Sequence, residues 1–177
     1  MSPEALRTYL GMIDHNPRME FTKQFARSAF ERALESWRWL DLQGKDPLFT
    51  SLFGDVFFAS SDGIWFLDAI SGALSRPWEN HSGMESVLAT DQGKDQFLMN
   101  ELALAAHAQG LVLKPNEVYN FVPPPVLGGK LDPGHMVTMD FVVALNIAGQ
   151  IHGQIKDLAP GTRISGITVD GAPPGDV

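Results

Sequence analysis

Apolar residues in the first part of the chain follow a helical period. Between residues 19 and 40 apolar side chains recur every fourth position, at Phe21, Phe25, Ala29, Ala33 and Trp37. This spacing predicts a helix with one wide apolar face that packs onto a larger body. Ser2, Pro3 and Glu4 favour the start of a short earlier helix, because serine caps the first amides and proline fits the first helical position. That helix is expected to end near residue 14, before the break at His15-Asn16-Pro17.

After a loop at residues 44–47 the pattern changes to short strands. Residues 55–59 and 64–67 are rich in aromatic and β-branched side chains and flank Asp62-Gly63. Asp-Gly is a strong hairpin signal, because glycine adopts the positive φ that the turn requires. Ser71-Gly72 marks a second turn, followed by a third predicted strand over residues 73–77. Three strands joined by short turns predict an antiparallel meander.

Helical and strand patterns are mixed in the second half of the chain. Helices are predicted over residues 84–89, with Ser82 as cap, and from Asp91 to a left-handed terminus at Gly110. Residues 114–129 are expected to be irregular, because Pro123-Pro124-Pro125 excludes regular helix and Gly128-Gly129 permits a sharp bend. A strand over 136–142, a helix over 143–157 and a last strand over 163–169 complete the prediction.

The order of these elements predicts an α+β fold, in which helices pack against an antiparallel hairpin and meander sheet. At 177 residues the chain has the usual length of one domain. We expect one domain over residues 1–170, with an N-terminal helical segment at 1–45 and the main body at 50–170. The tail, residues 171–177, reads GAPPGDV and is expected to be disordered.

The charge of the chain bears on the kind of partner it binds. It carries 21 acidic and 13 basic residues, for a net charge of −8, and its lysines and arginines are scattered singly. Direct binding to nucleic acid is disfavoured, because phosphate contacts require clustered cations. An acidic surface suits a basic partner, although mild acidity also keeps a protein soluble.

Cysteine usage and hydropathy indicate the compartment. The chain has no cysteine, which excludes disulfides, thiolate zinc sites and a cysteine nucleophile. No stretch approaches the roughly 18 apolar residues of a membrane span, and the first residues show no basic region followed by an apolar run. A cytoplasmic location without membrane contact is therefore expected.

No catalytic or metal-binding motif is recognisable. The five histidines lie far apart and outside HxH or HExxH patterns, so a zinc site would need tertiary convergence. No GxSxG is present, and Gly128-Gly129 lacks the lysine of a phosphate loop. Carboxylate pairs such as Asp62 with Asp68 stay open, since sequence does not give their separation. We therefore predict no catalytic residue, no metal ligand and no cofactor.

Candidate partner-binding residues lie on turns and loops, where function concentrates and where aromatic anchors contribute most to interfaces. The first group belongs to the meander and its turns: Asp62, Trp65, Asp68, Trp78 and Glu79. The second group belongs to the proline-rich loop over residues 120–130: Asn120, Pro124 and Lys130. Core burial is the competing interpretation for both tryptophans.

Three segments of the chain carry a resemblance to a known family. They read FGDVFFASSDGIWFLDAISGALSRPWEN, VYNFVPPPVLGGKL and NIAGQIHGQIKDLAPGTRI, and together they span about residues 53–167. The chain resembles the Tdi-type immunity proteins of bacterial type VI secretion systems. The resemblance lies in Gly54-Asp55, in the turns at Asp62-Gly63 and Gly72, in the loop over residues 126–129 and in the run over 149–162. It departs from them in its first 50 residues, where a short helical segment replaces a longer N-terminal region.

The resemblance implies a non-catalytic protein that binds and blocks a cognate toxin, a secreted DNase, and it provides no catalytic residues. A DNase presents cations to phosphates, so an acidic protein is steered to that same surface. Two alternatives stay open. One is a general interaction or adaptor domain of the same fold with a non-toxin partner. The other is an enzyme whose site gathers His152, Asp140 and Asp157 near the Gly128-Gly129 loop.

Overall fold

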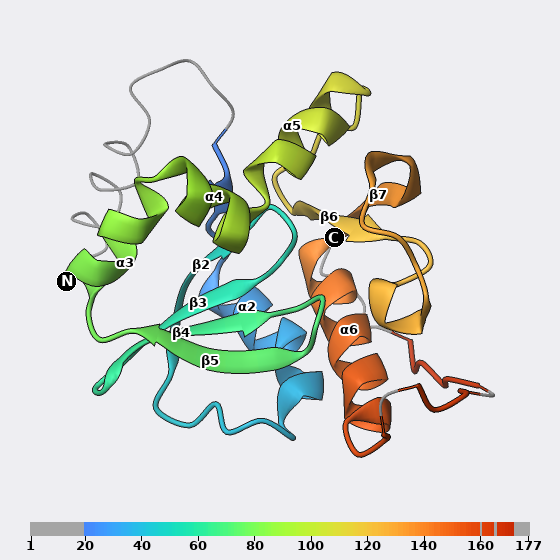
Figure 1. Cartoon of the computed structure of the whole chain (residues 1–177). Coiled ribbons are helices and arrows are strands. Elements are labelled where there is room, and N and C mark those ends of the chain that lie inside the picture. The colour runs from blue at the N-terminus through green and yellow to red at the C-terminus, as the bar shows by residue number, and fades with distance from the viewer. Residues whose placement is uncertain (1–19, 160, 165, 172–177) are drawn as a thin grey trace.

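The computed structural model describes residues 20–159, 161–164 and 166–171. The helix predicted before residue 14 and the tail after Gly171 lie outside these residues. A five-stranded antiparallel sheet has the order β1-β2-β3-β4-β5. Its strands are β1 (Thr22–Lys23), β2 (Asp46–Ser51), β3 (Val56–Ser60), β4 (Gly63–Asp68) and β5 (Ala73–Trp78). The predicted α+β class and the meander of β3, β4 and β5 are confirmed (Figure 1).

The helix predicted over residues 19–40 is too long at both ends. Thr22 and Lys23 form the edge strand β1, which pairs with Ser51 and Thr50 of β2. Ala26 is still extended, and only then does α2 (Arg27–Ala33) begin, followed by the 3-10 turn η1 (Glu35–Trp37). The four-residue spacing of Phe21 and Phe25 reflects tertiary packing, since Phe25 stacks on Phe141 with ring centroids 4.0 Å apart. β2 itself overlaps the predicted loop at residues 44–47.

Helices cover both faces of the sheet, because side chains alternate along β3 and β4. Val56, Phe58 and Leu67 face a core shared with α2, η1 and the long helix α6 (Phe141–Ile155). Phe57 and Phe66 face the other way, toward α3 (His81–Leu88) and α4 (Asp91–Leu98). Figure 1 shows α3 and α4 on one side of the sheet and α2 with α6 on the other.

A second sheet of two strands pairs β6 (Glu117–Phe121) with β7 (Met136–Asp140). β6 corrects the prediction that residues 114–129 are wholly irregular. The connection between the two strands contains two 3-10 turns, η2 (Pro125–Leu127) and η3 (Pro133–His135). A third core cluster lies between this sheet, the turn at Leu52 and Phe53, and α5 (Asn100–Ala108).

The helix predicted from Asp91 to Gly110 is interrupted. Met99 has a φ of 48° and separates α4 from α5, and its amide still donates to the carbonyl of Asp95. Gly110 has the left-handed φ that was predicted for the helix end. The caps are Asn80 and Thr90, whose side-chain oxygens accept from the amides of Gly83 and Gly93, in place of Ser82 and Asp91.

The predicted strand over residues 163–169 is also wrong for the residues of this segment that the structure describes, which lie outside the strands. Two glutamines of α6 hold this segment instead. Gln154 exchanges hydrogen bonds with the backbone of Thr168, and Gln150 does the same with Asp170. Side-chain amides therefore replace the backbone ladder that a strand would need.

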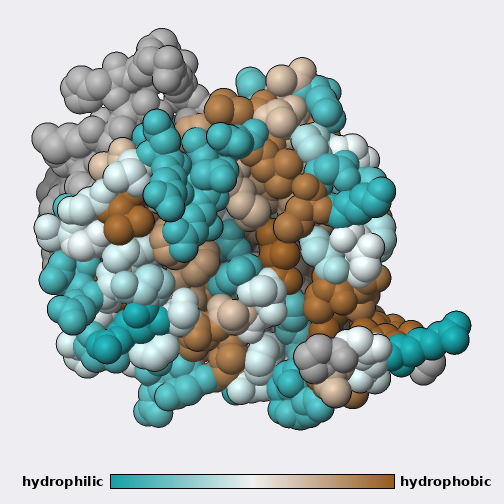
Figure 2. All heavy atoms as spheres, viewed as in Figure 1, coloured by the Kyte–Doolittle hydropathy of each residue, from teal (hydrophilic) through white to brown (hydrophobic). Residues whose placement is uncertain are grey.

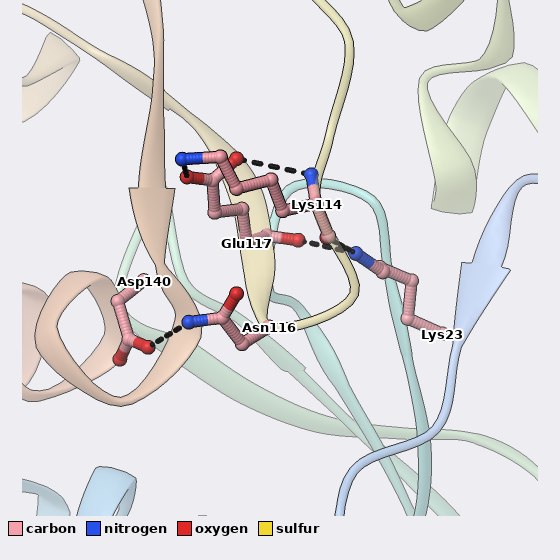
Figure 3. A network of polar contacts seen from close by, with 5 residues as sticks. All are labelled: Lys23, Lys114, Asn116, Glu117 and Asp140. Atoms are coloured by element: carbon pink, nitrogen blue, oxygen red, sulfur yellow. Dashed lines mark hydrogen bonds and ion pairs between the residues drawn. The ribbon is translucent and has the colours of Figure 1, made fainter. Parts of the chain in front are cut away.

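A polar network joins the edge of the large sheet to the small sheet and to the start of α6 (Figure 3). The ammonium of Lys23 donates to the carbonyls of Lys114 (2.5 Å) and Glu117 (2.7 Å). Asn116 donates to Asp140 at 2.8 Å, and Asp140 caps α6 by accepting from the amides of Val142 and Val143. The network fixes where β6 lies relative to both neighbours.

The first half and the middle of α6 are positioned by tryptophans that approach its backbone. Trp37 is fully buried and its indole donates to the carbonyl of Leu145 at 2.8 Å, and Trp39 donates to that of Gly149 at 3.2 Å. A Cβ on Gly149 would lie 2.2 Å from Oγ of Ser36 and 2.7 Å from the Trp37 indole. Glycine is thus required at this crossing of η1 and α6.

We predict that Gly149→Ala lowers the free energy of unfolding by about 2 to 3 kcal/mol, because overpacking outweighs the helical preference of alanine. Gly153→Ala, one turn later, is the matched control. Its Cβ would meet only the half-buried Trp39 ring, at 3.1 Å, so a change within about 1 kcal/mol is expected. Urea unfolding of both variants tests this, and equal stabilities would contradict the close packing of η1 on α6.

Candidate functional site

The hairpin end of the meander places two of the candidate residues in contact with each other and with cations. The Trp65 indole donates to Oδ1 of Asp62 at 2.9 Å. The guanidinium of Arg76 donates to the carbonyl of Asp62 and lies 3.7 Å from its carboxylate. The ammonium of Lys45 lies 4.1 Å from the centre of the Trp65 ring. This hairpin cluster, Asp62, Trp65, Arg76 and Lys45, combines one carboxylate with two cations, so it is not an acidic patch.

Trp78 is a core residue, which corrects its assignment as an exposed anchor. Its side chain is only 6% exposed and packs against Phe57 and Phe97. The next residue, Glu79, is exposed. It follows the end of β5, where the Trp78 carbonyl lies against Gly63 of the hairpin turn. Glu79 therefore belongs to the same end of the sheet as Asp62 and Trp65.

Asp68 lies at the opposite end of β4, about 20 Å from Asp62 at the usual rise per strand residue. Its Oδ1 accepts from the amides of Ile70 and Ser71, both at 2.9 Å, and so shapes the turn into β5. The structure thus divides the meander candidates between two ends of the sheet. The separation also removes Asp62 with Asp68 as a general acid and base pair.

The turn after Asp68 shares a cavity with the proline-rich loop. Ala69 and Ile70 line it together with Asn120 and Pro124. Further walls come from Phe53 and Gly54, from Tyr119, Phe121, Pro125 and Val126, and from α6 between Ala144 and His152. The cavity has a volume of about 40 Å³. Asn120 and Pro124 therefore line one cavity, Asp68 lies directly before its lining residue Ala69, and the hairpin cluster lies outside the lining.

The loop that forms one wall of the cavity is built by glycine geometry, as predicted. Gly128 has a φ of 93° and ends η2. A Cβ on Gly129 would lie 1.8 Å from the carbonyl oxygen of Pro123, and its amide donates to the carbonyl of Pro124. Lys130 follows as an exposed residue outside the cavity lining. The bend therefore holds Pro124 against the cavity and turns Lys130 toward solvent.

Two buried ionisable residues meet at Ala69, in the wall of the cavity. Asp55 is 2% exposed; one of its oxygens accepts from the Ala69 amide at 2.9 Å and the other from the Ser51 hydroxyl at 2.6 Å. The Nε2 atom of His152 lies 3.2 Å from the Ala69 carbonyl. A Cβ on Gly72 would clash with the same imidazole, at 2.5 Å. His152 therefore fixes the turn between β4 and β5 onto α6, and Asp55 fixes the same turn onto the end of β2.

Burial shifts the pKa of each group in the direction that favours its neutral form. Loss of solvation, together with the negative charge of Asp68, raises the pKa of Asp55 to about 7. Loss of solvation lowers the pKa of His152. A neutral imidazole has one N–H, which Nε2 donates to the Ala69 carbonyl in this arrangement. Sequence reasoning left Asp55 out of the candidate partner-binding site and used His152 only in the enzyme alternative, because nothing local marks either as buried.

The enzyme alternative is not supported by the placement of its carboxylates. Asp140 caps the start of α6 and Asp157 lies beyond its end, about 25 Å away at the helical rise per residue. The two carboxylates therefore do not gather around His152. Within the described ranges, no group of three or more His, Asp or Glu side chains is arranged to hold a metal ion.

Among the described helices, none is both long and apolar enough to cross a membrane.

Residues 84–152 match the family model described as T6SS immunity protein Tdi1, C-terminal. The match supports a type VI secretion immunity protein. The matched stretch begins in α3 and ends in α6, and it contains Asn120, Pro124, Lys130 and His152. The proline-rich loop and the α6 wall of the cavity therefore lie inside it, and the hairpin cluster lies outside.

A solved structure shares the fold. The crystal structure of Atu4351 from Agrobacterium tumefaciens superposes with a TM-score of 0.52 over 85% of this chain and 81% of that chain. The two sequences are 16% identical, so the likeness concerns the fold alone. No curated protein matches the sequence.

The raised pKa of Asp55 makes a prediction about stability and pH. The contribution of Asp55 to the free energy of unfolding is fully present below the pKa of the unfolded chain, 3.8, and is lost as the pH rises through the folded pKa of about 7. Asp55→Asn keeps an acceptor for the Ala69 amide and removes the ionisation. In the original chain, ionisation of Asp55 should lower the free energy of unfolding by on the order of 4 kcal/mol between pH 4 and pH 8, and this decrease should be absent in the variant.

Urea unfolding at several pH values measures this difference, with Asp157→Asn as the control at an exposed carboxylate. His152 acts in the opposite direction, because its lowered pKa removes stability as pH falls below 6.5. The comparison between variants isolates Asp55. A pH profile of Asp55→Asn that coincides with that of the original chain would show that Asp55 is not buried as described.

Proposed function

We propose that this protein is a non-catalytic immunity protein that binds and neutralises a cognate type VI secretion effector, a DNase, in the cell that produces both. The family match over residues 84–152 is the observation that carries the proposal. It favours a binding role over a catalytic one. The cavity at the proline-rich loop lies largely within the matched stretch, which makes this part of the molecule the first candidate for contact with the effector.

The charge of the chain supports a nuclease as the partner. Besides the net charge of −8, the stretch from residue 77 to 113, which contains α3, α4 and α5, has five carboxylates and a single lysine, Lys94. A DNase needs cations to contact phosphates. An acidic protein binds such a surface, is steered to it by long-range attraction, and repels nucleic acid itself.

The binding surface in this proposal has a primary and a secondary part. The primary part is the cavity lined by Asn120 and Pro124, together with Asp68, which precedes the lining residue Ala69, and the exposed Lys130, which follows Gly129. The secondary part is the exposed end of the meander with Glu79 and the hairpin cluster. In that cluster Asp62 and Trp65 are already held by Arg76 and Lys45, so they present a fixed shape and little net charge.

Co-expression with the effector encoded by the adjacent gene tests the proposal in a sensitive bacterium. We expect survival, a stoichiometric complex on purification, and loss of DNA cleavage at one equivalent of this protein in vitro. An effector with its nuclease site inactivated controls for binding without toxicity. If the effector kills regardless and does not co-purify, while other proteins bind this chain, the adaptor interpretation replaces the immunity function.

Electrostatic steering gives a second prediction, for the rate of association. Glu79→Lys with Asp95→Lys, on the α3 and α4 side, should slow association with the effector about tenfold at low salt. Glu31→Lys with Asp157→Lys changes the net charge equally at other exposed positions and should slow it about twofold or less. Stopped-flow or surface-based kinetics at several salt concentrations measure both. Equal slowing by the two pairs would show that only net charge matters.

A further inference from the structure

The cavity at the proline-rich loop is too small and too apolar for most small ligands. Its volume is about 40 Å³, whereas a cavity that accepts a benzene ring has on the order of 150 Å³. The end of an aliphatic side chain fits the smaller volume, and an aromatic ring does not.

The polar groups of the lining are already bonded within the protein. The Asn120 amide donates to the sulfur of Met139, and its oxygen accepts from the Phe121 amide. The imidazole of His152 is bonded to the Ala69 backbone. An ordered water needs two to four polar partners, so the interior favours apolar atoms over water.

Exposed apolar side chains continue from the cavity across the surface. Val122 (53% exposed) belongs to the proline-rich loop and Leu131 (55%) directly follows it, and Leu104 and Val112 lie in and after α5. Figure 2 shows an apolar band from α5 toward η2. Contiguous apolar surface of this kind is typical of a binding groove.

The charge on the α4 and α5 side of the groove selects among possible occupants, because Lys130 and Asp132 offset each other on the loop side. α4 and the first turn of α5 carry Asp91, Asp95 and Glu101, all exposed, with Lys94 as the one cation of that stretch. A second copy of this chain would bring another net charge of −8 to the same face and would be repelled. A segment with basic residues beside an apolar side chain is complementary both to the carboxylates and to the groove.

We infer that the groove between α5 and the proline-rich loop is the docking site for a positively charged segment of the effector, which inserts an aliphatic side chain into the cavity between that loop and α6. This inference rests on the proposed immunity function and adds a contact surface and an occupant to it. Acidic residues of α4 and α5 attract the segment, and the cavity fixes its register.

Filling the cavity from inside tests the inference. Ala148 is a half-buried lining residue on α6, and Ala148→Leu places a branched side chain where the inserted one would lie. We expect the affinity for the effector to fall at least tenfold, through faster dissociation, with the salt dependence of association unchanged. Ala89→Leu adds the same atoms at the exposed end of α3 and should leave the affinity within twofold.

A second variant keeps the test decisive if Ala148→Leu folds poorly. Val122→Ser with Leu131→Ser removes the apolar rim at exposed positions, where folding is little affected, and should weaken binding about as much. If both variants bind the effector with wild-type affinity, the groove is not the docking site, and the immunity function is unaffected by that result. Absence of binding by the unaltered protein would instead reject the proposed function. A dimer of the unaltered chain, detected by sedimentation and disrupted by Ala148→Leu, would assign the groove to a second copy and also overturn the inference.

Discussion

The close approach of α6 to its neighbours is the constraint on which the cavity depends. At Gly149 the helix backbone meets the Trp37 indole and Ser36, and at His152 its side chain meets the Ala69 carbonyl and Gly72. The first contact sets the depth of α6 against η1, and the second sets its position along the large sheet. The proline-rich loop then closes over the remaining space, which leaves a small cavity and not a filled core. A shift of α6 by the width of one methyl group would either fill or open that space.

Asp55 shows what fixing this arrangement costs. A carboxyl group in the interior is unfavourable when ionised, and its raised pKa of about 7 expresses that penalty. In return it accepts hydrogen bonds from Ser51 and from the Ala69 amide, and so joins the end of β2 to the turn after β4. The turn that it fixes carries Asp68 and lines the cavity. A site formed by such rigid elements loses little conformational entropy when a partner binds.

The parts of the fold that sequence predicts are those with local causes. The Asp62-Gly63 turn specifies the hairpin, and the run of residues before and after it alternates between two cores, so β3, β4 and β5 follow. Other features depend on contacts distant in sequence. Phe21 and Phe25 follow a helical spacing, but pairing with β2 and stacking on Phe141 override it; Met99 breaks a helix that the pattern would continue. The cavity is the extreme case, since its walls lie between residues 53 and 152 and no local pattern brings them together.

Recognition of one toxin among many related ones requires more than charge. Long-range attraction accelerates the encounter with any basic surface, and it discriminates poorly because it does not depend on shape. A small apolar cavity has the opposite property: it contributes little at a distance, yet one methylene too many or too few changes binding by about 1 to 3 kcal/mol. In the proposed complex the carboxylates of α4 and α5 therefore set the rate of association, and the space between the proline-rich loop and α6 sets the selectivity. Changes in the lining residues would alter which effector is bound without altering how fast the first contact forms.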